Sequence, residues 1–157
     1  MREKDVFSAS DNEGTMTFED YFGIQQLLSS YSLVLDRCTR RQASWESFTD
    51  LWIDDGVFDM SAMDLGRIEG AQAITEAMKI GVQPAGHHVG NLFVHSFSGD
   101  EAEVSVKAIQ IIFDGRSCTG TYDDTVRRTA GGWKFVVRRP WVETIDENAA
   151  KPIYVPQ

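Results

Sequence analysis

The chain has 157 residues, 42% of them apolar and 11% aromatic, and its formal net charge at pH 7 is −9. This length and composition suit one domain around one core, and no apolar run approaches the roughly 18 to 20 residues that a membrane-spanning helix requires. The acidic balance argues against an extended nucleic-acid surface, because such binding comes largely from Lys and Arg that displace counterions. We therefore expect a soluble protein with neither a nucleic-acid nor a membrane partner.

The two ends of the chain differ in composition from its middle. Residues 1–16 mix charged residues with Ser and Gly and lack the apolar run of a secretory signal, so we expect a flexible arm there. The folded domain is predicted to span 17–143. The tail at 144–157 contains Pro152 and Pro156, and we expect it to lie over a pocket mouth or a subunit contact.

The first half of the chain shows helical patterns with short strands between them. Thr17 followed by Asp20 resembles a capping box and predicts a helix that begins there and runs to about Cys38. Its apolar residues recur on one stripe at helical spacing. The later patterns predict a short helix at 44–51, short strands at 57–60 and 67–69, and a third helix at 71–80.

Strands dominate the second half. Alternating segments separated by Gly-containing turns predict long strands at 87–97, 102–113, 117–129 and 133–142. Helices gathered first and a strand meander gathered last are typical of the α+β class. We expect a cone-shaped, curved antiparallel sheet that wraps around the N-terminal helices and encloses one central pocket.

Several reaction classes lack their residue patterns. The sequence contains no GxGxxG, GxxxxGK[ST] or GxSxG motif, so we expect no nucleotide cofactor and no serine nucleophile. Cys38 and Cys118 form no CxxC unit, which favours packing roles in a reducing cytoplasm. His87 and His95 lie roughly 26 Å apart at about 3.3 Å per strand residue, so they cannot share a metal ion. We expect no metal and no cofactor.

Acid–base chemistry by one histidine remains open. His87 begins the first long strand, where alternation places Asn91 and Phe93 on its face, and Asp36 lies at the end of the first helix. A carboxylate bonded to one imidazole nitrogen leaves the other free to take a proton. The alternative is that His87 and Tyr31 are ordinary core residues and that a neighbouring arginine holds Asp36.

The sequence resembles the SnoaL-like branch of the nuclear transport factor 2-like superfamily over residues 17–142. Within that branch it is most similar to the scytalone dehydratases, hexachlorocyclohexane dehydrochlorinases and bile-acid 7α-dehydratases. The segments that carry the resemblance are YSLVLD at 31–36, TDLWIDD at 49–55, HHVGN at 87–91, GTYDD at 120–124 and WKF at 133–135.

The resemblance implies a site and an assembly. It implies a His–Asp dyad of His87 and Asp36, with Tyr31 as a third catalytic residue, and a homodimer or homotrimer. One departure is that the strand after His87 offers no second histidine, only Ile109, Gln110, Ile111 and Ile112. The implied substrate-binding residues are Phe58, Asn91, Tyr122 and Arg138.

We therefore expect a cofactor-independent lyase, of the dehydratase or dehydrohalogenase type, or an isomerase. Its partner would be a small hydrophobic ring compound, and its reaction would use His–Asp acid–base catalysis. The alternatives are a polyketide cyclase and a non-catalytic binding or assembly subunit, because one fold can carry many functions.

Overall fold

The computed structural model describes residues 14–143, and its first element is the long helix α1, Phe18–Thr39. The capping box predicted at its start is present: the Thr17 hydroxyl accepts a hydrogen bond from the backbone N–H of Asp20, and the Asp20 carboxylate accepts one from that of Thr17. The apolar stripe of α1 is buried, as expected from its spacing. None of the described helices is long and apolar enough to cross a membrane.

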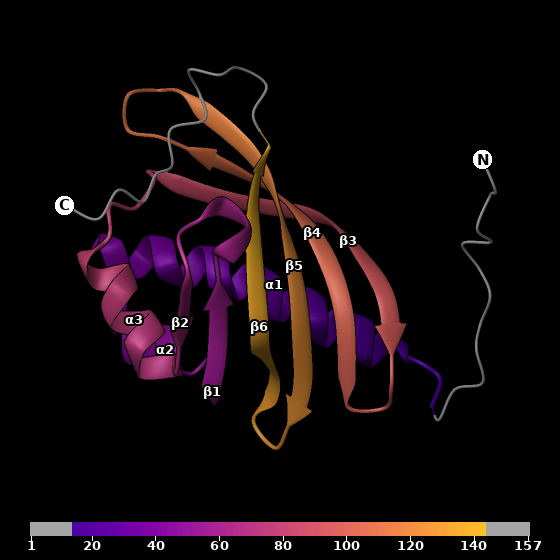
Figure 1. Cartoon of the computed structure of the whole chain (residues 1–157). Coiled ribbons are helices and arrows are strands. Elements are labelled where there is room, and N and C mark those ends of the chain that lie inside the picture. The colour runs from indigo at the N-terminus through magenta and orange to yellow at the C-terminus, as the bar shows by residue number, and fades with distance from the viewer. Residues whose placement is uncertain (1–13, 144–157) are drawn as a thin grey trace, which may run out of the picture.

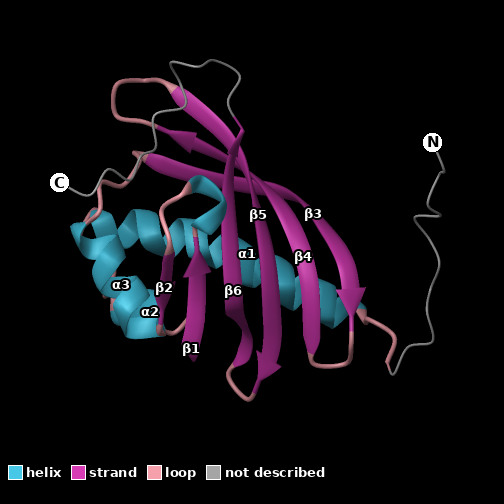
Figure 2. Ribbon diagram, viewed as in Figure 1, coloured by secondary structure: helices cyan, strands magenta, loops and turns pink. Residues whose placement is uncertain are grey.

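Six strands form one curved sheet, in the spatial order β2 (Arg67–Glu69), β1 (Trp52–Asp59), β6 (Gly132–Glu143), β5 (Ser117–Thr129), β4 (Glu101–Ile111) and β3 (Gly86–Phe97). Helix α1 runs across the concave side of this sheet, and the shorter helices lie at the β1 end (Figures 1 and 2). The other elements are α2 (Glu46–Thr49), a 3₁₀ helix (Ser61–Met63) and α3 (Ala71–Ile80).

The observed elements follow the predicted order, with differences at the boundaries. Helix α2 is shorter than predicted, and β1 begins at Trp52 rather than at residue 57. One pair of strands is parallel: β1 runs in the same direction as its neighbour β6, with Phe58 opposite Arg138. The α+β class and the curved sheet are confirmed, but the sheet is not antiparallel throughout. The arm at 1–13 and the tail at 144–157 lie outside the described residues.

Strand β3 contains two irregularities that alter which side chains point inward. Its pairing with β4 shifts between Gly90 and Phe93 and again between Val94 and Ser96, and Asn91 has a left-handed φ of 58°. Each shift inserts one extra residue into β3, which reverses the alternation of its side chains. His87 and Val89 therefore share the concave face with Leu92 rather than with Asn91.

Candidate active site

The expected pair of His87 and Asp36 is joined by two hydrogen bonds. Asp36 Oδ1 lies 2.7 Å from Nδ1 of the His87 ring, and Asp36 Oδ2 accepts a bond of 3.1 Å from the His87 backbone N–H. Helix α1 supplies the carboxylate, and the beginning of strand β3 supplies the imidazole. The two side chains are 14% and 4% exposed, so water has little access to the bond between them.

The pair has a defined protonation pattern at neutral pH. Burial raises the pKa of Asp36, but the hydrogen bonds from the His87 ring and backbone outweigh burial and leave that pKa below its ordinary value. Because Asp36 is then a carboxylate, Nδ1 of His87 carries the proton and donates it. The other ring nitrogen, Nε2, has no hydrogen-bond partner among residues 14–143.

His87 lines a small cavity of about 40 Å³ that Asp36 does not reach. The carboxylate therefore lies behind the imidazole, while Tyr31, from the same helix as Asp36, reaches the cavity directly. Most of the wall is apolar. The lining consists of Tyr31, Phe58, Met60, Met63, Leu65, His87, Gln110, Tyr122, Pro140 and Val142.

Arg138 lies next to this cavity, inside the core. Its guanidinium donates two hydrogen bonds to Asp124, of 2.9 and 2.8 Å, and both side chains are fully buried. It lies 4.1 Å from the centre of the Tyr31 ring and 4.0 Å from that of Tyr122. Burial opposes its charge, but the facing carboxylate outweighs burial and raises the pKa of Arg138. The guanidinium of Arg138 is therefore charged, whereas burial raises the pKa of Asp124 although Arg138 opposes that shift.

The structure brings together most of the residues singled out in the sequence, but not all of them. His87, Tyr31, Phe58 and Tyr122 line the one cavity, with Asp36 behind His87. Asn91 is exposed at the first bulge of β3 and lies outside that lining, because the extra residue turns it to the outer face. The prediction from alternation was wrong for Asn91 and also for Phe93, which is exposed.

Arg138 is likewise absent from the residues that line the cavity. It reaches inward from β6, but Asp124 takes two of its donor groups, and the Tyr31 and Tyr122 rings lie against it. Its Nη1 is buried without a hydrogen-bond partner. In this structure Arg138 supports two of the cavity's aromatic side chains from behind.

Gln110 was not singled out as a site residue, although it lines the cavity and lies directly opposite His87 in the sheet. Its amide nitrogen donates a 3.1 Å hydrogen bond to the Tyr122 hydroxyl oxygen. The hairpin turn near Gly99 could have been used to predict which residue of the next strand lies opposite His87. Regular pairing about that turn, however, would place Ile112 there. The two bulges of β3 shift that register to Gln110.

Other reactive groups give no second candidate within the described chain. Residues 14–143 contain no group of three or more His, Cys, Asp or Glu side chains that could hold a metal ion. Cys38 and Cys118 are free thiols, and burial raises the pKa of both, which disfavours the nucleophilic thiolate.

Comparison with protein families identifies the fold from the sequence itself. A model of the SnoaL-like domain matches residues 16–139. A search of curated protein sequences found no match.

Solved structures with this fold include proteins of several kinds. A proposed aromatic ring hydroxylase from Novosphingobium aromaticivorans is 27% identical, with a TM-score of 0.69 over 87% of this chain and 100% of that chain. A proposed scytalone dehydratase from the same species is 25% identical, with a TM-score of 0.64 over 80% of this chain and 85% of that one. LinA is 19% identical, with a TM-score of 0.63 over 80% and 87% of the two chains, and shows similarity of fold alone.

Proposed function

The chain belongs to the SnoaL-like domain family, and we propose that it is a cofactor-independent lyase or isomerase acting on a small hydrophobic ring compound. The observation that carries this proposal is the hydrogen bond between Asp36 and Nδ1 of His87, a histidine that lines a largely apolar cavity. A proposed scytalone dehydratase of similar fold, 25% identical, supports the reaction class.

In the proposed reaction, Nε2 of His87 is the general base. It takes a proton from a ring carbon, and the electrons of that C–H bond form a new double bond as a leaving group departs or a neighbouring carbonyl becomes an enolate. Asp36 stabilises the imidazolium that forms, because its carboxylate already accepts the Nδ1 proton. The proton is then returned to the leaving oxygen in a dehydration, or to another ring carbon in an isomerisation.

The hydroxyl groups of Tyr31 and Tyr122 are the proposed donors to the substrate oxygen or leaving group. Burial raises the pKa of Tyr122, so this phenol stays protonated and can donate at neutral pH. Gln110 donates to the Tyr122 oxygen, which leaves the hydroxyl proton available for a ligand. We propose that Arg138 positions the two rings rather than touching the substrate.

The absence of a second histidine opposite His87 narrows the proposed mechanism. Gln110 occupies that position, and an amide neither takes nor gives a proton at neutral pH. One imidazole must therefore perform both proton transfers of a dehydration or an isomerisation. Loss of a halide needs only the first transfer, because the halide leaves as an anion.

Substrate entry requires the cavity to widen. It offers about 40 Å³, whereas a cavity of about 150 Å³ is known to take a benzene ring. Met60, Met63 and Leu65 form part of its wall around the 3₁₀ helix. Methionine side chains are unbranched and adapt readily to a ligand, so we propose that this segment moves aside when the ring enters.

We also propose that the protein forms a homodimer or homotrimer and that it is located in the cytoplasm.

The test is turnover without added cofactor or metal. The purified protein is incubated with cyclic hydroxyketones, cyclic enones and halogenated cyclohexanes, and products are followed by absorbance and halide release. We expect turnover of one class, and we expect His87→Gln to lower it by about 10²-fold or more while still melting cooperatively. Compounds that raise the melting temperature but are never converted would instead indicate a binding protein.

A further inference from the structure

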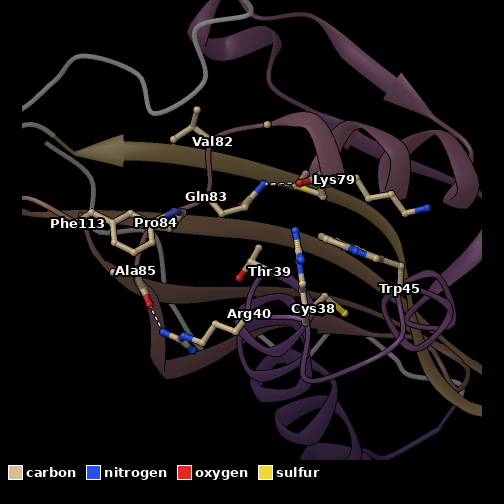
Figure 3. A pocket seen from close by; sticks show the side chains of 13 residues that line it. Cys38, Thr39, Arg40, Trp45, Lys79, Val82, Gln83, Pro84, Ala85 and Phe113 are labelled. Carbon is tan, nitrogen blue, oxygen red and sulfur yellow. Dashed lines mark hydrogen bonds between the residues drawn. The ribbon is translucent and has the colours of Figure 1, made fainter.

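A second cavity, of about 470 Å³, lies apart from the cavity that His87 lines. It is formed where the C-terminal ends of α1 and α3 meet the segment that leads into β3 (Figure 3). Neither His87 nor the cavity tyrosines line it. Its volume lies within the roughly 300 to 1,000 Å³ that is typical of small-molecule sites, whereas the His87 cavity is far smaller.

The charged residues that line this second cavity are all basic, although the net charge of the chain is −9. Lys79 is neutralised by Glu76 at 2.6 Å. Arg40 instead donates only to backbone carbonyl oxygens, those of Ala85 and Asp36. The Arg41 side chain has no hydrogen-bond or ion-pair partner among residues 14–143. Neither guanidinium forms an ion pair with a carboxylate of the described residues, although the charge of Arg40 is felt by the nearby Asp36 carboxylate.

Apolar side chains form the other part of the lining. Trp45, Val82, Pro84 and Phe113 line the cavity, with Trp45 across it from the contact between Arg40 and Ala85 (Figure 3). Val82 is 64% exposed and Phe113 is 80% exposed, so both present apolar surface that the described chain leaves uncovered. Uncovered apolar surface beside two arginines that form no ion pair is suited to a molecule with an anionic head and an apolar body.

We propose that this second cavity binds an organic anion with an apolar body, of the alkyl or aryl carboxylate class. Arg40 and Arg41 take the carboxylate, because a guanidinium offers two parallel N–H donors to its two oxygens. Trp45, Val82 and Phe113 cover the apolar body. The site shares no lining residue with the cavity of the proposed active site.

The test uses decanoate as the ligand and decanol as its uncharged counterpart. Each is titrated against anilinonaphthalene sulfonate fluorescence with the full chain, and direct binding is measured by calorimetry. We expect decanoate to bind with one site per chain and decanol to bind at least about tenfold more weakly. Equal affinities would overturn the proposal, because the arginines would then contribute nothing, and so would an absence of decanoate binding.

The arginine variants locate the site. Arg41 has a left-handed φ of 58°, so Arg41→Asn removes the charge with a residue that tolerates this conformation. We expect Arg41→Asn to weaken decanoate binding by about tenfold, while Arg37→Gln, an exposed residue of α1 outside the lining, leaves it unchanged. Equal losses in both variants would show an effect of net charge only and would contradict the site.

A second variant covers the case in which Arg41→Asn does not fold. Val82→Glu places a negative charge at an exposed wall position, and it should weaken decanoate binding by about tenfold while weakening decanol binding less, because decanol loses only the apolar contact. His87→Gln serves as the reference for the other cavity and should leave decanoate binding intact. If His87→Gln abolished decanoate binding and Val82→Glu did not, the ligand would lie in the His87 cavity and this proposal would fail.

Discussion

The residue on which the proposed chemistry depends most sharply is Asp36, because its carboxylate touches His87 but not the cavity. Asp36→Asn keeps the shape and removes the charge that stabilises the imidazolium. We expect kcat to fall on the order of 10²-fold or more, with only a small decrease in melting temperature, since an amide can still accept one of the two bonds from His87. Turnover and melting temperature are measured on the same preparation.

Asp50→Asn is the matched control for this variant. Asp50 is exposed and follows the last residue of α2, and its side chain forms no hydrogen bond or ion pair with the described residues. The control should retain full activity and stability. An Asp36→Asn protein that melts lower yet keeps its turnover would show that the carboxylate serves packing and not the reaction.

The ion pair of Arg138 and Asp124 makes a separate prediction about stability. Both side chains are fully buried, so Asp124→Asn leaves a guanidinium charge without its partner in the core. We expect the free energy of unfolding to fall by about 3 to 5 kcal/mol. The pair of Arg127 and Glu101 at the surface has the same N–O distance of 2.8 Å, although both Arg127 nitrogens donate to one oxygen. Glu101→Gln should lower the free energy of unfolding by less than about 1 kcal/mol. Urea unfolding of both variants checks the contrast.

At this scale the sequence predicts the dyad better than the rest of the cavity. The contact between His87 and Asp36 could be expected because one residue begins a strand and the other ends a helix beneath it. The roles of Arg138 and Gln110 depend on partners in neighbouring strands, Asp124 for one and Tyr122 for the other. Local alternation carries no information about such partners.

Among the elements, α1 has the clearest start signal, and its capping box can be tested alone. Thr17→Ala removes the hydroxyl that accepts from the Asp20 N–H. We expect the free energy of unfolding to fall by about 1 kcal/mol, whereas Thr17→Ser, which keeps the hydroxyl, should stay within about 0.5 kcal/mol of the original chain. The free energy is measured by urea unfolding, with circular dichroism as the signal. Equal losses in the two variants would show that the methyl group matters rather than the cap.

Strand β3 shows why element boundaries were easier to predict than side-chain directions. Its span agrees with the prediction to within one residue, because the flanking turn and the β-branched and aromatic residues are local signals. The two bulges depend on how β3 pairs with β4, and no single residue marks them in advance. One of them turns Asn91 outward, and together they bring Gln110 opposite His87.

In the whole molecule, both cavities border the region where the C-terminal half of α1 meets the start of β3: Arg40 and Ala85 line one cavity, and Tyr31 and His87 line the other. Arg40 illustrates the connection: it lines the second cavity and also bonds to the backbone carbonyl oxygen of Asp36. The sequence predicted the order of the elements, but the parallel pairing of β1 with β6 joins segments about 80 residues apart. Hydrophobic patterning reports which face of a strand is buried and not which strand lies beside it.

The stability of the whole molecule should depend on pH through its carboxylates. Asp20, Asp36 and Asp59 are among those whose pKa lies below the ordinary value of 3.8. The backbone N–H of Thr17 lowers the pKa of Asp20 and Ser61 lowers that of Asp59, while for Asp36 burial raises the pKa but the bonds from His87 outweigh burial. The pKa of Asp124 shifts in the opposite direction, because burial raises it. The exposed carboxyl groups of Glu76, Asp114 and Glu143 also have a lowered pKa, so among the described carboxyl groups with a shifted pKa, the lowered ones outnumber the raised one.

A carboxyl group with a lowered pKa binds fewer protons in the folded chain than in the unfolded chain. Its contribution to stability is complete above the unfolded pKa and is lost as the pH falls through the folded one. We expect the free energy of unfolding to change little between pH 7 and about pH 5 on this account and to fall steeply below about pH 4. Urea unfolding at stepped pH measures this slope, and Asp36→Asn should flatten it because that variant no longer takes up a proton there. A slope identical in the variant and the original chain would mean that Asp36 is not held as a carboxylate by His87.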